Sequence, residues 1–207
     1  MDPKRRLAPL LTETQREQLQ VAMLEDTLQT LIKARMVKNT FIVSSNAQML
    51  EFARRFGANP LAEPKDAGVN SAVLLGLDST SAYARRLVIP ADLPLLTAED
   101  VKMGPMLARE GSQVVVSPSE SFDGTNMLLL GKGTDMELHY DDDSFRKHVA
   151  TANAIGLKVA VYYSRGVAFD IDRPRDVHQF FKFNKRGSTL TLLGRTLRKS
   201  QKAEARS

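Results

Sequence analysis

The chain has no cysteine and no tryptophan, and aromatic residues make up only 6% of its 207 residues. The absence of cysteine excludes disulfides, thiolate zinc sites and a cysteine nucleophile. Long apolar runs are also missing, since none approaches the ~18 residues that a membrane helix needs. The basic N-terminus has no apolar stretch behind it, so it is no secretory signal. We therefore expect a cytoplasmic protein without a membrane partner.

The charge of the chain is uneven along its length. Residues 185–207 contain seven basic residues and one acid, so they carry +6, whereas residues 1–184 carry −1. Hydrophobic residues at 43% and charged residues at 26% exclude general disorder, collagen and coiled coil. We predict one domain at 1–184 and a basic C-terminal tail at 185–207. The tail has no aromatic stacking partners, so nucleic acid is not an expected ligand.

Strand-like and helical segments alternate along the body, which predicts an α/β fold with a mostly parallel sheet in three layers. A doubly wound domain usually opens with a central strand, yet no strand precedes the first helix here. Either translation begins upstream or the sheet lacks that strand. Strands are expected at 40–44, 61–63, 86–90, 113–117, 126–130, 158–163 and 167–171. Helices are expected from 12 and 97, and at 47–56, 69–77, 144–155 and 174–183.

Three helix starts carry a recognisable cap. Thr12 and Gln15 have the spacing of a capping box, in which side chain and backbone satisfy each other's free hydrogen-bonding groups. Asn46 and Asp143 precede two further predicted helices, and both residue types are favoured at such ends. These signals predict where the helices begin.

Acidic residues follow two of the predicted strands. Asp92 comes after the strand at 86–90, and Asp170 and Asp172 end the strand at 167–171. Residues i and i+2 of a strand share a face, about 6.5–7 Å apart, so this pair can address one cation. With Asp92 they predict a Mg²⁺ site of the kind that handles phosphates. The alternative is that such acids only cap the next helix.

Three further polar segments stand out, and for two of them a structural and a functional interpretation are both open. The loop at 121–126 is either a turn between strands or a cradle for an anion. The acids at 141–143 precede a predicted helix and would complement its dipole. The basic cluster at 4–6 is either a solvated arm or a site that neutralises a polyphosphate.

Several familiar chemistries are absent. The sequence contains no P-loop, no dinucleotide fingerprint, no Gly-x-Ser-x-Gly and no His-Glu-x-x-His motif. The histidines His139, His148 and His178 are not clustered in the sequence and are interpreted as surface or packing residues. Hydrolase triads and zinc sites are therefore not expected.

Taken together, the motifs resemble those of the 2-phospho-L-lactate guanylyltransferase family, in the family's order over nearly the whole body. Each short motif alone would suit other nucleotidyltransferases of the molybdopterin-guanylyltransferase type. The matching segments are 4–9, 22–26, 68–72, 91–96, 123–126, 144–148 and 170–174.

The resemblance implies a GT-A-like, Rossmann-like nucleotidyltransferase fold that uses GTP and Mg²⁺. The acceptor in this family is 2-phospho-L-lactate, phosphoenolpyruvate or a phosphoglycerate. The products are a guanosine diphosphate ester and pyrophosphate, in biosynthesis of coenzyme F420. The family also favours a homodimer. Its motifs imply Asp92, Asp170 and Asp172 as catalytic Mg²⁺ ligands, Lys4, Arg6, Asn70 and Ser71 as nucleotide-binding residues, and Thr125 and Ser144 as acceptor-binding residues.

One feature of the chain departs from the pattern of the family. The family prefers small residues, often glycine, before the position of Ser144, where this chain has the acids at 141–143. These acids would repel an incoming phosphate unless they turn outward or help to bind metal. The alternatives are another GT-A-type nucleotidyltransferase, acting on a molybdopterin or a sugar phosphate, and a non-catalytic GTP-binding relative that lacks its first strand.

Overall fold

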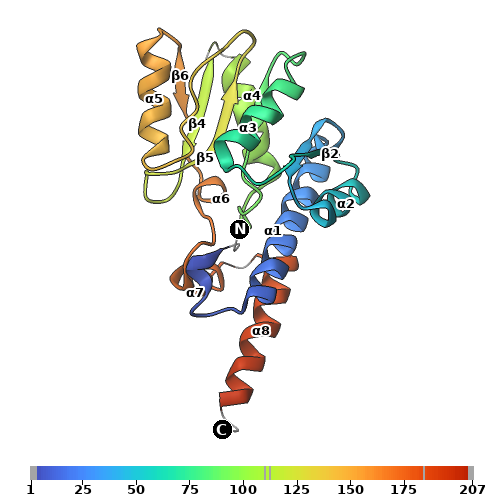
Figure 1. Cartoon of the computed structure of the whole chain (residues 1–207). Helices are drawn as coiled ribbons and strands as arrows, with labels where there is room; N and C mark the ends of the chain where they lie inside the picture. Colours follow the sequence, from blue (N-terminus) through green and yellow to red (C-terminus); the bar gives the residue numbers. More distant parts are fainter. Residues whose placement is uncertain (1–3, 110, 112, 184, 205–207) are drawn as a thin grey trace.

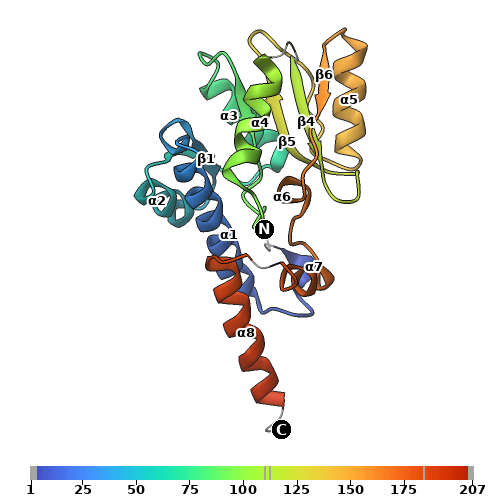
Figure 2. The same cartoon turned by 180° about the vertical axis from the view of Figure 1, so that it is seen from behind.

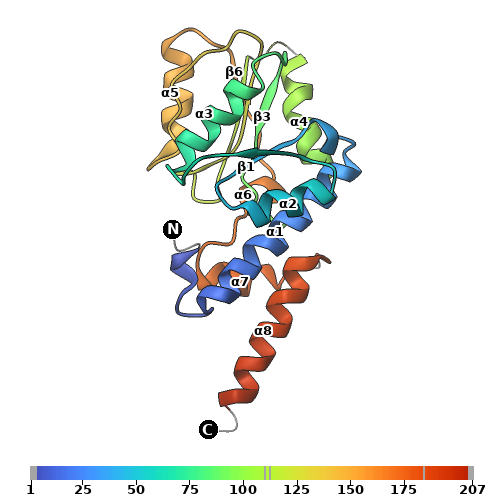
Figure 3. The same cartoon turned by 45° about the vertical axis from the view of Figure 1, so that its right-hand side comes forward.

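The computed structural model describes residues 4–109, 111, 113–183 and 185–204. A central sheet with helices on both faces forms one end of the molecule, and a group of helices that includes both described ends of the chain forms the other (Figure 1). The helix α8 (Ser188–Glu204) projects away from the sheet in all three views (Figures 1 to 3).

The central sheet has four strands in the order β3, β5, β4, β6. Three of them run in the same direction, and β5 is antiparallel to both β3 and β4. This confirms the predicted α/β fold with a mostly parallel sheet. The bounds are β3 (Arg86–Val88), β4 (Val114–Pro118), β5 (Thr125–Leu130) and β6 (Val159–Val161).

Helices cover both faces of this sheet. On one face lie α3 (Val69–Ser79) and α5 (Ser144–Ala154). On the other lie α4 (Ala98–Arg109), α6 (Arg165–Ala168) and the end of α1 (Glu13–Lys33), and α4 is in front in Figure 2. The three layers expected from the sequence are therefore present.

The alternation of side chains along β4 explains why both faces are covered. Val114 and Val116 pack in the apolar cluster with α5, whereas Val115 packs in the cluster with α4 and α6. All three are fully buried. A strand that is apolar on both faces needs a helix on each side to remove it from water.

The N-terminal half carries a second, two-stranded sheet. Its strands β1 (Phe41–Ser44) and β2 (Asn59–Ala62) are parallel, and α2 (Ala47–Arg55) connects them. The caps that the sequence predicted here are confirmed. Asn46 Oδ1 accepts hydrogen bonds from two N–H groups of α2, and the capping box at the start of α1 is complete.

From Lys4 onward, the described chain enters α1 through a short 3₁₀ helix, η1 (Arg5–Leu7), without a strand before it. Another short 3₁₀ helix, η2 (Val37–Asn39), follows α1. The helix α7 (Pro174–Phe180) starts with proline, as predicted. Leu7, Leu19 and Phe180 belong to one apolar cluster that joins η1, α1, α7 and α8.

The basic C-terminal segment folds as α8 and packs against α1. Asp26 of α1 accepts hydrogen bonds from Ser188 N at 2.8 Å and Thr189 N at 3.0 Å, which caps the start of α8. Leu193 is 1% exposed. At least as far as this residue, the segment is a docked helix and not a solvated tail, although the domain division at 184/185 stays a prediction. No helix of the described chain is long and apolar enough to cross a membrane.

Two local predictions are wrong. The segment 167–171 is not a strand, because Ser164 accepts a hydrogen bond from Val167 N and starts the short helix α6 instead. Asp143 occupies the N-cap position of α5, which begins at Ser144 as predicted, but its side chain makes no capping hydrogen bond. Its backbone is left-handed, with φ of 58°, and its side chain forms an ion pair with Arg146 at 2.7 Å.

Candidate active site

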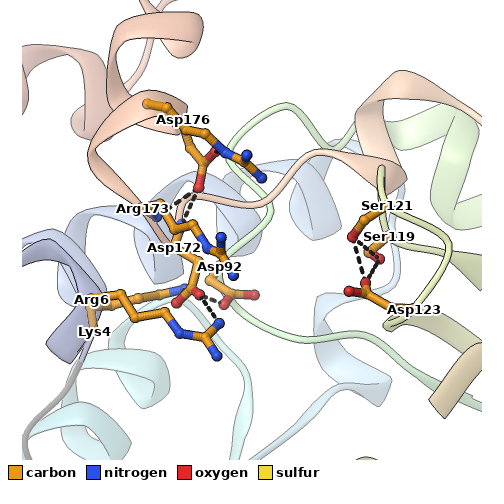
Figure 4. A network of polar contacts seen from close by, with 10 residues as sticks. Lys4, Arg6, Asp92, Ser119, Ser121, Asp123, Asp172, Arg173 and Asp176 are labelled. Atoms are coloured by element: carbon orange, nitrogen blue, oxygen red, sulfur yellow. Dashed lines mark hydrogen bonds and ion pairs between the residues drawn. The ribbon is translucent and has the colours of Figure 1, made fainter. Parts of the chain in front are cut away.

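Lys4 contacts Asp92 and Asp172, two of the three acids that the sequence predicted as metal ligands (Figure 4). Its ammonium is 2.7 Å from Asp92 Oδ2 and 3.8 Å from Asp172 Oδ1, and the charge of Asp170 also acts on it. The Lys4 side chain is only 9% exposed. The structure thus brings three segments that are far apart in the sequence together around one cation.

The charges in this cluster influence each other. Burial would lower the pKa of Lys4, but the charges of Asp92, Asp172 and Asp170 and the hydrogen bond to Asp92 raise it above its usual value. Burial, followed by the charges of Asp92 and Asp172, raises the pKa of Asp170 to about 6. The charge of Lys4 acts in the opposite direction. Lys4 is therefore a firmly charged cation that partly compensates three carboxylates.

Arg6 adds a second cation at the edge of the cluster. Its guanidinium donates to Asp172 Oδ2 at 2.6 Å, and this bond raises the pKa of Arg6. The Arg6 side chain is 67% exposed, unlike that of Lys4. Leu7, at the end of the same short helix as Arg6, is fully buried and packs this segment into the apolar cluster.

Asp170 and Asp172 share a side of the chain although they do not lie in a strand. Phe169 and Ile171 are 2% and 0% exposed, so the extended segment after α6 turns these two apolar residues into the core. The acids between and after them face the other way, toward Lys4. The alternation predicted from a strand persists between Phe169 and Arg173, whose backbones are both extended.

Two side chains hold this acidic segment at its ends. Asn126 Nδ2 donates to Val167 O at 2.9 Å and to Ala168 O at 3.2 Å, at the end of α6. Asp176 Oδ2 accepts from Asp172 N at 3.0 Å and also from the backbone of the next residue. The positions of both acids are thus fixed from β5 on one side and from α7 on the other.

The loop between β4 and β5 carries one more carboxylate, Asp123, whose charge acts on Arg6 and which Figure 4 shows to one side of the Lys4 cluster. Asp123 Oδ1 accepts from Ser119 Oγ at 2.8 Å and from Ser121 Oγ at 2.5 Å, and these bonds lower the pKa of Asp123. The segment is therefore a turn between two strands, as one interpretation predicted. Its serine hydroxyls serve its own carboxylate.

Thr125 and Ser144, the expected acceptor-binding residues, lie side by side. Ser144 Oγ donates to Thr125 Oγ1 at 3.2 Å, and Thr125 Oγ1 is 2.9 Å from His148 Nδ1. His148 is fully buried, and burial and the charge of His139 lower its pKa to about 4. The two rings are 6.0 Å apart, so these histidines lie close together in space although they are separated in the sequence. The i, i+4 spacing of Ser144 and His148 on one helix was the available signal.

The expected nucleotide-binding pair on α3 makes no described contact with the carboxylates. Asn70 Oδ1 accepts from Tyr140 N at 2.8 Å and joins α3 to the segment before α5. Ser71 is exposed. Their assignment to the nucleotide stays a prediction.

The acids before α5 turn toward basic residues of that helix. Asp141 pairs with Lys147 at 3.0 Å, and Asp143 pairs with Arg146 at 2.7 Å. All three acids are in exposed or half-exposed positions. The outward orientation that the sequence left open therefore holds for two of them, and their charge is paired.

Left-handed backbone is concentrated around these groups. Lys4, Phe122 and Asp143 have φ values of 50°, 60° and 58°, and Arg35 is the one other non-glycine residue with positive φ in the described chain. Such conformations cost about 1–3 kcal/mol each and tend to occur at functional sites. The three residues flank the acid cluster, the Asp123 loop and Ser144.

The donor set suits a hard divalent cation, with one qualification. Carboxylate oxygens are the ligands that Mg²⁺ prefers. Those of Asp92 and Asp172 lie 2.7 and 3.8 Å from the ammonium of Lys4, and the charge of Asp170 also acts on this cation. In the described residues, however, no group of three or more acidic or histidine side chains is already placed to hold a metal ion. Lys4 would have to release these oxygens first.

Comparison with known proteins identifies the family. The family described as "Guanylyl transferase CofC like" matches residues 1–203. The chain is 32% identical to a 3-phospho-D-glycerate guanylyltransferase from Phenylobacterium zucineum, over 84% of this chain and 81% of that protein. It is 32% identical to a phosphoenolpyruvate guanylyltransferase from Sphaerobacter thermophilus, over 85% of each. It is 33% identical to a 2-phospho-L-lactate guanylyltransferase from Methanothermobacter thermautotrophicus, over 84% and 76%.

Solved structures agree on the fold. A protein from Desulfovibrio desulfuricans described as a nucleotide-diphospho-sugar transferase aligns with a TM-score of 0.74 at 16% identity, over 93% of this chain and 87% of that one. A cytidylyltransferase from Leptospira borgpetersenii aligns with a TM-score of 0.56 at 14% identity, over 86% and 84%. The fold is thus that of nucleotidyltransferases, and the chain belongs to the CofC-like family of guanylyltransferases.

Proposed function

We propose that this chain transfers a guanylyl group from GTP to the phosphate of 2-phospho-L-lactate, phosphoenolpyruvate or 3-phospho-D-glycerate, in biosynthesis of coenzyme F420. The relatives are named for these acceptors. The observation that carries the proposal is the cluster in which Lys4 and Arg6 contact Asp92 and Asp172. It joins phosphate-binding cations to carboxylates that can hold a metal.

The reaction needs little acid or base chemistry. An oxygen of the acceptor phosphate, already ionised near pH 7, forms a bond to the α-phosphorus of GTP, and the bond from that phosphorus to the bridging oxygen breaks. Pyrophosphate leaves with the electron pair. The protein's task is to align the two phosphates and to stabilise the charge on the leaving group.

Lys4 and Arg6 are suited to the leaving group. Both are charged, and among the residues that the structure describes their side chains bind carboxylates. A triphosphate would compete with Asp92 and Asp172 for them, and Arg6 can bind phosphate oxygens through its planar fork. Their release from the carboxylates is then coupled to nucleotide binding.

Asp92, Asp170 and Asp172 would hold Mg²⁺ once Lys4 has turned to the nucleotide. The ion would neutralise phosphate charge there. Thr125 and Ser144 would bind the phosphate or carboxylate of the acceptor with their hydroxyl groups. Asn70 and Ser71 would face the nucleotide, as the family resemblance implies.

The test is a pyrophosphate-release assay with GTP and Mg²⁺, in which each of the three acceptors is offered separately. Release that depends on one acceptor supports the proposal and names the substrate. Release with CTP but not GTP, or with a sugar phosphate only, would favour another nucleotidyltransferase. GTP binding without release under any condition would favour a non-catalytic relative. A cytoplasmic homodimer belongs to the same proposal, and its mass in solution tests the dimer.

A further inference from the structure

His148, on α5, is hydrogen-bonded through both of its ring nitrogens. One partner lies in the segment before α5, and the other is Thr125 at the start of β5. Nε2 lies 2.9 Å from the backbone nitrogen of His139, and Nδ1 lies 2.9 Å from Thr125 Oγ1. The residue is 0% exposed. A buried imidazole with two partners at these distances is held in one orientation.

The backbone contact decides which nitrogen carries the hydrogen. The N–H of His139 can only donate, so Nε2 of His148 must accept and cannot be protonated. In a neutral imidazole the hydrogen is then on Nδ1. His148 therefore donates this hydrogen to Thr125 Oγ1, and the hydroxyl of Thr125 is the acceptor.

The hydroxyl of Thr125 must therefore point its own hydrogen away from His148 and Ser144. It accepts from His148 and from Ser144 Oγ, the latter at 3.2 Å, so its two acceptor positions are used. No described residue accepts the hydrogen of Thr125 Oγ1. Ser144 Oγ has one hydrogen to donate, and Thr125 Oγ1 at 3.2 Å is nearer than its other acceptor, Asp123 O at 3.5 Å, so the hydrogen goes to Thr125.

We propose that His148 is a positioning residue that makes Thr125 donate its hydroxyl hydrogen to an anionic oxygen of the acceptor substrate. This inference rests on the proposed function, because it assigns Thr125 to the acceptor. It adds a residue that touches neither substrate and acts through Thr125. It also gives the threonine a defined polarity, since a hydroxyl that only accepts from the protein can only donate to the ligand.

The groups around His148 keep its ring neutral at pH 7, so Nδ1 stays the donor and Thr125 Oγ1 the acceptor. Burial first, and then the charge of His139, lowers the pKa of His148 to about 4, while Asp141 acts in the opposite direction. The ring of Tyr140 packs edge-on against it at 5.0 Å. The charged groups that face it are thus His139 and Asp141, and a neutral ring is the form present at pH 7.

Kinetics of variants at His148 and Thr125, with a control at His178, test the role. His148→Leu removes both hydrogen bonds, and His148→Asn keeps an N–H close to the position of Nδ1. We expect His148→Leu to raise the KM for the acceptor about tenfold, with the KM for GTP changed less than about twofold. His148→Asn should restore most of the acceptor KM. In a Thr125→Val background, His148→Leu should have no further effect on it. His178→Asn, on the exposed side of α7, is the matched control.

Nitrogen-15 NMR of labelled histidine tests the hydrogen-bond pattern without any turnover. We expect His148 to be protonated at Nδ1 at pH 7, and protonation at Nε2 would overturn the inference. An active wild type whose acceptor KM is unchanged in His148→Leu, or whose two KM values rise together, would also overturn it while leaving the proposed function intact. A wild type without pyrophosphate release for any acceptor would instead remove the proposed function and, with it, the role of Thr125.

Discussion

The ammonium of Lys4 lies 2.7 Å from the carboxylate of Asp92, a residue 88 positions later in the chain. The pair joins the segment before α1 to the segment after β3. Asp170 and Asp172 complete the surroundings from the segment after α6. Under the proposed function a phosphate would compete with these carboxylates for Lys4, so Lys4 is the first residue to substitute.

Lys4→Met should lower kcat/KM for GTP by about 10²–10³, because one charged donor to the leaving pyrophosphate is lost. The pyrophosphate-release assay with varied GTP measures this. Lys102→Met, on the exposed face of α4, is the control and should keep wild-type values. Near-normal turnover in Lys4→Met would show that Lys4 only compensates the carboxylates.

Asp92→Asn and Asp172→Asn should each reduce turnover below about one hundredth of the wild-type value, since each removes a charged oxygen ligand for Mg²⁺. The melting temperature should stay within a few degrees, because both side chains are about 30% exposed and lie outside the apolar core. Activity and thermal melting are measured on the same preparations. Asp78→Asn, on the exposed side of α3, is the control. A variant that remained active would contradict the metal assignment.

Asn126→Ala should destabilise the protein by about 1–3 kcal/mol, because two carbonyl groups at the end of α6 lose their donor in a buried place. Turnover should fall as well, since the segment with Asp170 and Asp172 loses its anchor on β5. Urea unfolding and the release assay measure the two effects. Asn153→Ala, exposed on α5, should change neither. A loss of stability without any loss of turnover would separate Asn126 from the site.

Stability should fall in acid partly through His148. Its pKa is about 4 in the folded protein and near 6.5 when unfolded. The unfolded chain therefore binds more protons between these values, so the free energy of unfolding decreases as the pH falls from about 6.5 to 4, by about 2–3 kcal/mol. Urea unfolding at a series of pH values should show this slope, and His148→Leu should lack it. Equal slopes in both proteins would mean that other groups cause the loss.

Asp26→Ala should loosen α8 by removing the acceptor of two N–H groups at its start, at a cost of about 1–2 kcal/mol. Limited proteolysis should then cut within 185–204 faster than in the wild type. Glu25→Ala, at the neighbouring position, is the control. Unchanged proteolysis would mean that packing of Leu193 and its neighbours holds the helix without the cap.

Local signals in the sequence predicted many elements correctly. The capping box at Thr12, the cap at Asn46 and the apolar runs of β4 and β5 act over a few residues, and the structure has each of them where expected. The segment after Ser164 shows the limit of such signals. Its apolar alternation is typical of a strand, yet Ser164 Oγ accepts a hydrogen bond from Val167 N and starts a helix. Extended backbone follows only after this helix, from Phe169.

For the candidate site as well, the sequence predicts one part and only the tertiary structure determines the other. The sequence by itself determined which residue types are available, because Lys4, Arg6 and the three aspartates lie in recognisable motifs, and it determined that Asp170 and Asp172 would share a side. Only the tertiary structure decided that Lys4 sits between the carboxylates and that His148 holds Thr125. The same holds for α8, whose basic residues suggest a solvated tail until Asp26 and the apolar surface of α1 are in place. The physical reason is that burial and charge pairing depend on which distant segments meet, and that is set by packing of the whole chain.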